Sequence, residues 1–166
     1  MKRRKLLATV VVGIVAAAAV TAHALWPGNA LDEVTFVTLK GERLQLRELR
    51  GKIVLVNFWA TSCPACVKEM PELMTTYEHY RARGFEVVAV AMAYDPPAFV
   101  KEFVAKNGLP FPVALDTQEE IAKAFGGVKV VPTTFVLGKD GQPVSRTLGM
   151  IAFDKLQAFL DQSLGR

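Results

Sequence analysis

The chain has 166 residues, a length that suits one compact domain and leaves little room for a second core of ordinary size. Apolar residues make up 51% of the chain and charged residues 22%, which excludes an intrinsically disordered protein. The net charge of +4 comes from residues 2–5 (KRRK), because basic and acidic residues balance in the rest of the chain. A folded part without net charge argues against a nucleic-acid partner.

The first 24 residues have the pattern of an export signal. The basic start is followed by an uncharged apolar run from Leu6 to Val20, and Ala22-His23-Ala24 offers small residues for cleavage. The run is also just long enough for a membrane anchor, which needs roughly 17–25 residues. We therefore expect residues 1–24 to be a cleaved signal or an anchor. The folded part is expected in the periplasm or another extracytoplasmic space, either soluble or tethered to the inner membrane.

The remaining chain is predicted to be a linker at residues 25–33 and one α/β domain at residues 34–166. Apolar runs rich in Val, Ile and Phe predict strands, and runs with helical spacing that end at glycine predict helices. In chain order we expect strands at 34–39, 44–46 and 53–59, a helix at 64–83, a strand at 85–92, a helix at 97–107, a strand at 111–115, a helix at 118–125, strands at 133–137 and 144–148, and a helix at 153–164. This order predicts a sheet with helices on both faces.

The two cysteines, Cys63 and Cys66, lie where the strand 53–59 leads into the predicted helix 64–83. A disulfide that closes so short a loop removes little entropy from the unfolded chain, so it suits thiol exchange better than structural support. Pro64 suits the first helical position, which places Cys63 at the N-cap, where free N–H groups and the helix dipole favour a thiolate. We expect Cys63 to attack a substrate disulfide and Cys66 to resolve the mixed disulfide.

A pair of cysteines with this spacing can also bind zinc or attach haem. Zinc needs about four ligands, and the chain has no second cysteine pair and only His23 and His79 as histidines. Val67 follows Cys66 where haem attachment would need a histidine. The sequence therefore predicts neither a metal nor a cofactor at this pair.

Several separated motifs resemble the TlpA/ResA-like branch of the thioredoxin superfamily. They are Gly51-Lys52, residues 57–66 (NFWATSCPAC), Glu69-Met70-Pro71 and residues 131–135 (VPTTF). The resemblance implies a thioredoxin fold with a central mixed sheet, an N-terminal β-hairpin and an αβ insertion within residues 95–125. It also implies reduction of protein disulfides in cytochrome c maturation or a related thiol-reduction pathway. A membrane thiol donor would then re-reduce the cysteine pair.

The same resemblance implies roles for residues around the cysteines. Pro132 is implied to be a cis-proline that faces the pair and leaves the backbone of Val131 free to bind an extended substrate. A glutamate at the position of Glu69 is linked in this family to tuning the cysteines, so we expect it to exchange protons with them. Trp59 and Pro64 are expected to border the substrate site, and Trp59 fits a core position equally well.

Three further residues near these motifs carry less information. Asn57 stands where ordinary thioredoxins have a buried aspartate, which leaves proton transfer to Glu69 or to water. Tyr94 and Asp95 follow the strand predicted at 85–92, and the sequence assigns neither of them a role.

Two other functions are compatible with this fold. A peroxiredoxin would need proline and threonine or serine before its cysteine, and Val56 and Ala60 occupy those places. A copper-handling or cuproprotein-assembly chaperone would hold Cu(I) on the two cysteines, but no third ligand stands nearby. Residues 64–65 lack the histidine that stabilises the thiolate in strongly oxidising relatives. This absence favours a reductant or a weak isomerase over an oxidant. Among the three functions, the sequence favours reduction of protein disulfides, with a copper chaperone as the alternative and a peroxiredoxin least.

Overall fold

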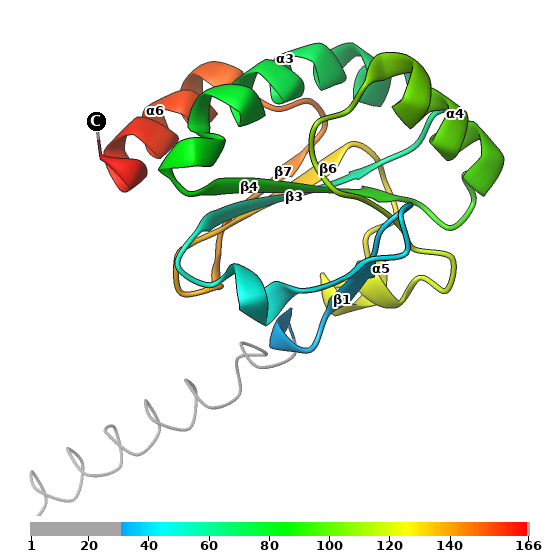
Figure 1. The fold of residues 1–166 in the computed structure, drawn as a ribbon, viewed down its shortest axis with the longest axis horizontal. Coiled ribbons are helices and arrows are strands. Elements are labelled where there is room, and N and C mark those ends of the chain that lie inside the picture. Colours follow the sequence, from blue (N-terminus) through cyan, green and yellow to red (C-terminus); the bar gives the residue numbers. More distant parts are fainter. Residues whose placement is uncertain (1–30, 166) are drawn as a thin grey trace, which may run out of the picture.

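A mixed five-stranded sheet organises residues 31–165, the part of the chain that the computed structural model describes (Figure 1). The strand order is β5-β4-β3-β6-β7. The strands are β3 (Ile53–Trp59), β4 (Phe85–Ala91), β5 (Val113–Leu115), β6 (Thr133–Leu137) and β7 (Pro143–Leu148). Strand β4 runs parallel to β3 and β5, whereas β6 runs antiparallel to β3 and β7. The predicted mixed sheet is confirmed.

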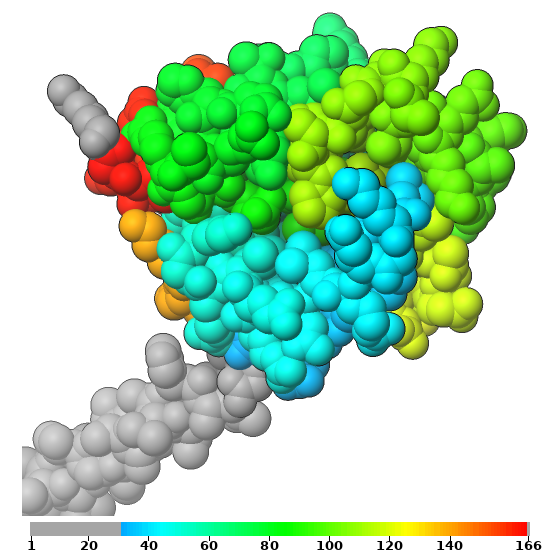
Figure 2. All heavy atoms as spheres, in the orientation of Figure 1, coloured from blue at the N-terminus to red at the C-terminus, as the bar shows by residue number. Residues whose placement is uncertain are grey.

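Different elements cover the two faces of this sheet. One face carries α3 (Pro64–Tyr80), α4 (Pro97–Asn107) and α6 (Phe153–Leu164). The other carries the hairpin of β1 (Thr35–Val37) and β2 (Arg43–Gln45), the 3₁₀ helix η1 (Leu46–Leu49) and the short α5 (Glu120–Ala124). In Figure 2 this N-terminal layer, coloured blue to cyan, forms the lower part of the visible surface, and the helices of the opposite face lie above it. The predicted thioredoxin fold, with its hairpin and its αβ insertion, is therefore present.

Strand β3 is buried at all seven of its positions because both of its faces are covered. Side chains alternate along a strand, so Leu55 and Trp59 join the core beneath α3 and α6, whereas Val56 and Phe58 join the core beneath the hairpin. Asn57 lies between Leu55 and Trp59 on the helix-covered face. This alternation brings a buried polar side chain to the inner side of α3.

The sequence located most helix ends, and the differences have local causes. The helix predicted to reach residue 83 ends as α3 at Tyr80 and continues as a 3₁₀ turn, η2 (Arg81–Arg83), before Gly84 at φ 99°. The helix predicted from residue 118 begins at Glu120, because the Asp116 carboxylate accepts hydrogen bonds from the N–H groups of Ile121 and Ala122. Side-chain caps of this kind fix where a helix begins.

The folded unit begins before residue 34. Leu31 is 8% exposed and packs in the core beneath the hairpin, and the Asp32 carboxylate pairs with Arg50 at 2.6 Å. Residues 31–33, predicted to belong to the linker, are therefore part of the domain. The predicted signal or anchor at residues 1–24 lies outside the described residues. Between residues 31 and 165, no helix combines the length and the apolar character that crossing a bilayer requires.

Candidate active site

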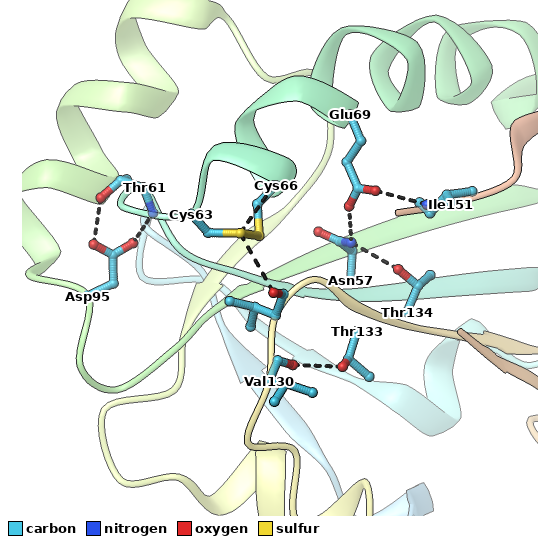
Figure 3. Close-up of a disulfide and its surroundings, with 11 residues drawn as sticks. Asn57, Thr61, Cys63, Cys66, Glu69, Asp95, Val130, Thr133, Thr134 and Ile151 are labelled. Atoms are coloured by element: carbon cyan, nitrogen blue, oxygen red, sulfur yellow. Dashed lines mark hydrogen bonds between the residues drawn. A yellow bond between two sulfur atoms is a disulfide. The ribbon is translucent and has the colours of Figure 1, made fainter. Parts of the chain in front are cut away.

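Cys63 and Cys66 form a disulfide where β3 leads into α3 (Figure 3). Their Cα atoms are 5.3 Å apart. Cys63 is the N-cap of α3, with an extended backbone, and its Sγ accepts a hydrogen bond from the backbone N–H of Cys66 at 3.2 Å. Pro64 occupies the first turn, where its missing N–H costs no intrahelical bond. The predicted N-cap position of Cys63 is confirmed.

The two sulfurs differ in their access to solvent. Cys66 is 0% exposed, whereas Cys63 is partly exposed. A bulky protein disulfide approaching from outside therefore meets the sulfur of Cys63 first. The backbone N–H of Cys66 and the positive end of the α3 dipole face this same sulfur and favour its ionised form after reduction.

The peptide bond between Val131 and Pro132 is cis. The carbonyl oxygen of Val131 lies 3.7 Å from Sγ of Cys63. The Oγ1 of Thr133 donates a hydrogen bond to the Val130 carbonyl at 2.7 Å, which holds this loop in place. Within residues 31–165 the backbone N–H of Val131 has no hydrogen-bond partner. Pro132 itself is buried, so the exposed edge of this loop is the backbone of Val131.

Glu69 lies one helical turn after Cys66 and is 1% exposed. Its Oε1 accepts a hydrogen bond from Nδ2 of Asn57, and its Oε2 accepts one from the backbone N–H of Ile151, both at 3.0 Å. Burial raises the pKa of the Glu69 carboxyl above its usual value, and the two hydrogen bonds oppose that shift. Burial therefore favours the protonated carboxyl, although both donors stabilise the carboxylate.

Asn57 connects Glu69 to the sheet. Its Nδ2 also donates to Oγ1 of Thr134 at 3.0 Å, and the side chain is 0% exposed. Its Oδ1 is buried without a hydrogen-bond partner among the described residues. Sequence analysis singled out Asn57 and Glu69 but missed Thr134 and Ile151. A backbone N–H that is 82 positions from Glu69 leaves no signal in the sequence.

The prediction that Trp59 borders the substrate site is wrong. Its side chain is 0% exposed and packs against Phe103 of α4, with ring centroids 5.1 Å apart. Because α4 covers this end of β3, the indole belongs to the core, which was the other interpretation of the sequence. Pro64, by contrast, is exposed beside Cys63, where an approaching chain would meet it.

A second carboxylate lies on the other side of the disulfide. Asp95 is 3% exposed, and its Oδ2 and Oδ1 accept hydrogen bonds from the backbone N–H and the Oγ1–H of Thr61, both at 2.6 Å (Figure 3). Thr61 precedes Cys63 by two residues. Sequence analysis assigned Asp95 no role and did not single out Thr61, because these residues are 34 positions apart. Between residues 31 and 165, no three His, Cys, Asp or Glu side chains converge as a metal site.

Comparison with known proteins shows which family and which relatives this chain resembles in sequence. The Redoxin family matches residues 27–152. A relative named thiol-disulfide oxidoreductase ResA from Bacillus thuringiensis (strain Al Hakam) is 34% identical over 171 residues, which cover 96% of this chain and 97% of that protein. The protein of the same name from Halalkalibacterium halodurans is 37% identical over 123 residues, 74% of this chain and 69% of its own.

Solved structures show the same similarity. A putative thioredoxin from Neisseria meningitidis superimposes with a TM-score of 0.75 at 36% identity, over 81% of this chain and 89% of that one. A putative thiol:disulfide interchange protein DsbE from Chlorobium tepidum gives a TM-score of 0.72 at 28% identity, over 81% and 95% of the two chains. The chain thus shares both sequence and fold with proteins named for thiol–disulfide exchange.

Proposed function

We propose a specific task for this chain, which belongs to the Redoxin family and is a thiol–disulfide oxidoreductase: it reduces disulfides of partner proteins outside the cytoplasm. The observation that carries this proposal is the pair of sulfurs at the start of α3. One sulfur is partly exposed, the other is buried, and the exposed one lies 3.7 Å from the carbonyl oxygen of Val131, next to the cis bond.

The unequal exposure of the sulfurs gives the order of the chemical steps. The thiolate of Cys63 attacks one sulfur of the substrate disulfide, the substrate S–S bond breaks, and the other substrate sulfur leaves as a thiolate that takes up a proton. The sulfur of Cys66 then attacks Sγ of Cys63 and releases the second substrate thiol. Two electrons pass from the dithiol to the substrate, and the chain is left with the disulfide seen in the structure.

Glu69 is proposed to handle the proton of Cys66. That thiol is buried and must lose its proton before it can attack, and Glu69 follows it by one helical turn. Burial raises the pKa of the Glu69 carboxyl, which makes it a better proton acceptor near neutral pH than an exposed glutamate. Its hydrogen bonds to Asn57 and to the Ile151 N–H hold the carboxylate in one place on the inner side of α3.

The backbone of Val131 is proposed to hold the substrate. Its N–H has no partner within the described residues, and its C=O faces Cys63, so an extended segment could pair with it as an added strand. The side chain of Val130, next to Val131 in the chain, is 58% exposed, and that of Val67, one helical turn after Cys63 on α3, is 36% exposed. Exposed apolar side chains beside the pairing site and beside the attacking sulfur suit an unfolded or extended protein segment better than a small polar disulfide.

The direction and the place of the reaction belong to the same proposal. Each reduction leaves the disulfide behind, so a membrane thiol donor must restore the dithiol. The pattern of residues 1–24 supports an extracytoplasmic location, either soluble or anchored at the membrane. The resemblance to the ResA-like branch supports a task in cytochrome c maturation or a related thiol-reduction pathway.

A trapping experiment tests this function. The Cys66→Ala variant of the full chain should hold partner proteins on Cys63 as mixed disulfides, because the resolving sulfur is gone. Non-reducing electrophoresis followed by mass spectrometry would identify the partners and the bridged cysteine. The matched Cys63→Ala variant should trap none, because its remaining sulfur is buried. Equal trapping by the two variants, or none by either, would contradict the proposed order of attack.

A further inference from the structure

The carboxylate of Asp95 makes both of its hydrogen bonds to a single residue, Thr61. Both carboxylate oxygens bind Thr61, one at its N–H and one at its hydroxyl, each at 2.6 Å. Hydrogen bonds to an ionised group are shorter and stronger than neutral ones, and a carboxylate that is only 3% exposed needs such partners to remain buried. The contact therefore holds Thr61 in one conformation.

The position of Asp95 in the chain would ordinarily suggest another role. It lies just before α4, where an aspartate commonly caps the first N–H groups of a helix. The N-cap of α4 is Pro96, however, and it makes no side-chain cap bond. The carboxylate of Asp95 instead binds Thr61, in the turn before Cys63 (Figure 3). Helix capping therefore does not explain this buried carboxylate.

The turn that Asp95 holds connects β3 to the attacking sulfur. The backbone N–H of Cys63 donates to the carbonyl of Ala60 at 3.1 Å, so Thr61 lies inside a closed turn. The carbonyl of Trp59, just before it, accepts from the N–H of Met92, and the Met92 carbonyl accepts from the N–H of Asp95. The end of β4 and the start of the insertion thus hold this turn through backbone and side chain together.

We propose that Asp95 is a positioning residue for thiol exchange: by binding Thr61 it fixes the turn that presents Cys63 at the start of α3, and it places a negative charge on that turn, two residues before the attacking cysteine. The inference rests on the proposed function in one respect, the role of Cys63 as the attacking sulfur. Through this contact the αβ insertion, which begins at Asp95, is hydrogen-bonded to the turn that leads to the cysteine pair.

The charge of Asp95 has a defined consequence for the reaction. A nearby negative charge disfavours the thiolate, and a less stable thiolate makes the dithiol a stronger reductant. On α3, Glu69 adds a second negative charge when it is ionised, and Lys68 is an exposed positive one. In the loop before the cis bond, Lys129 is also exposed.

Substitutions can separate the geometry from the charge. In Asp95→Asn the amide can accept from the Thr61 N–H and donate to its hydroxyl, so the turn is kept and the charge is lost. In Asp95→Ala both are lost. Thr61→Ser keeps both hydrogen bonds, and the nearly isosteric Thr61→Val keeps only the backbone one. Asp116→Asn is the matched control, because Asp116 is also a 3% exposed carboxylate with two hydrogen bonds, but at the start of α5.

Two measurements on the full chain read out these changes: the pH dependence of Cys63 alkylation by iodoacetamide, and the rate of insulin disulfide reduction. In Asp95→Asn we expect the pKa of Cys63 to fall by about half a unit, with a reduction rate at least that of the wild type. In Asp95→Ala the reduction rate should fall about tenfold, since a small misplacement of a reacting group is costly. Thr61→Val should slow reduction about threefold, and Thr61→Ser should match the wild type.

Equilibration with glutathione provides a third measurement. The loss of charge in Asp95→Asn should make the dithiol a weaker reductant, by about threefold in the equilibrium constant. An unchanged thiol titration in Asp95→Asn together with an unchanged rate in Asp95→Ala would overturn the proposal. Equal effects of Asp116→Asn would overturn it as well. If Asp95→Ala does not fold, the pair Thr61→Val and Thr61→Ser decides, and identical rates in these two refute the positioning role. Full activity of Cys63→Ser would instead refute the proposed function.

Discussion

The two carboxylates that flank the disulfide are held in opposite ways. Glu69, on the side of Cys66, receives one hydrogen bond from Asn57 and one from the Ile151 N–H, so its site is assembled from three separate segments. Asp95, on the side of Cys63, binds a single residue with both oxygens. Glu69 thus connects several segments, and burial raises the pKa of its carboxyl. Asp95 holds a single turn. The proposed proton transfer therefore lies on the side of Cys66, and the proposed positioning role lies on the side of Cys63.

This contrast depends first on the different roles proposed for the partly exposed sulfur of Cys63 and the buried sulfur of Cys66. Cys63→Ser should lower the rate of insulin reduction by about 10³-fold or more, because the attacking atom is lost. Cys66→Ser should still form a mixed disulfide in a single turnover but should not release it. Stopped-flow measurement of the first turnover separates these outcomes. A Cys66→Ser variant that fails to react at all would break the division of roles between the two sides.

The next largest effect is expected from Glu69→Gln, which removes the proton acceptor and keeps the shape of the side chain. Release of the mixed disulfide should slow about 10²-fold, the lower range for a general base, while the first attack by Cys63 slows much less. Single-turnover kinetics from pH 5 to 9 would resolve the two steps. Glu72→Gln, at an exposed position on the same helix, is the matched control. Equal slowing of both steps would show that Glu69 only supports the fold.

The raised pKa of Glu69 also predicts how the stability of the fold depends on pH. A carboxyl whose pKa is higher in the folded than in the unfolded state stabilises the fold below its unfolded value, near 4.5, and this contribution is lost as pH rises through the folded pKa. Relative to the wild type, Glu69→Gln should therefore gain free energy of unfolding as pH increases across this range. Urea denaturation of the oxidised proteins at several pH values tests the sign. A constant difference between the two proteins would contradict it.

The smallest effect on the reaction is expected at Thr134, which accepts a hydrogen bond from Asn57 in the network that links Glu69, Asn57 and Thr134. Thr134→Val removes the second acceptor of the Asn57 amide and should cost about 1 kcal/mol in the free energy of unfolding. The reduction rate and the thiol titration of Cys63 should stay within about twofold of the wild type, because Asn57 still donates to Glu69. A large change in the titration would show that the network reaches across the disulfide, which would weaken the contrast between its two sides.

Features that depend on neighbouring residues in the chain could be predicted from the sequence. The apolar run at 53–59 forms β3 with the predicted bounds, and Cys63 with Pro64 forms the expected start of α3. The helices at 97–107 and 153–164 also match. Periodicity, a proline at the first turn and a glycine at the end depend on a few adjacent residues, so a single sequence contains them in full.

The tertiary structure alone decided which residues meet around the sulfurs. Glu69 meets the N–H of Ile151 82 positions later, Asp95 meets Thr61 across 34 positions, and α4 buries Trp59 against Phe103. Each of these contacts depends on how the crossover connections return the chain to the sheet, and no local sequence pattern predicts the course of those connections. The sequence by itself thus determined the reactive pair, its place at a helix start and the class of fold. Long-range packing determined the surroundings of each sulfur, because burial and hydrogen bonding arise only when distant segments come together.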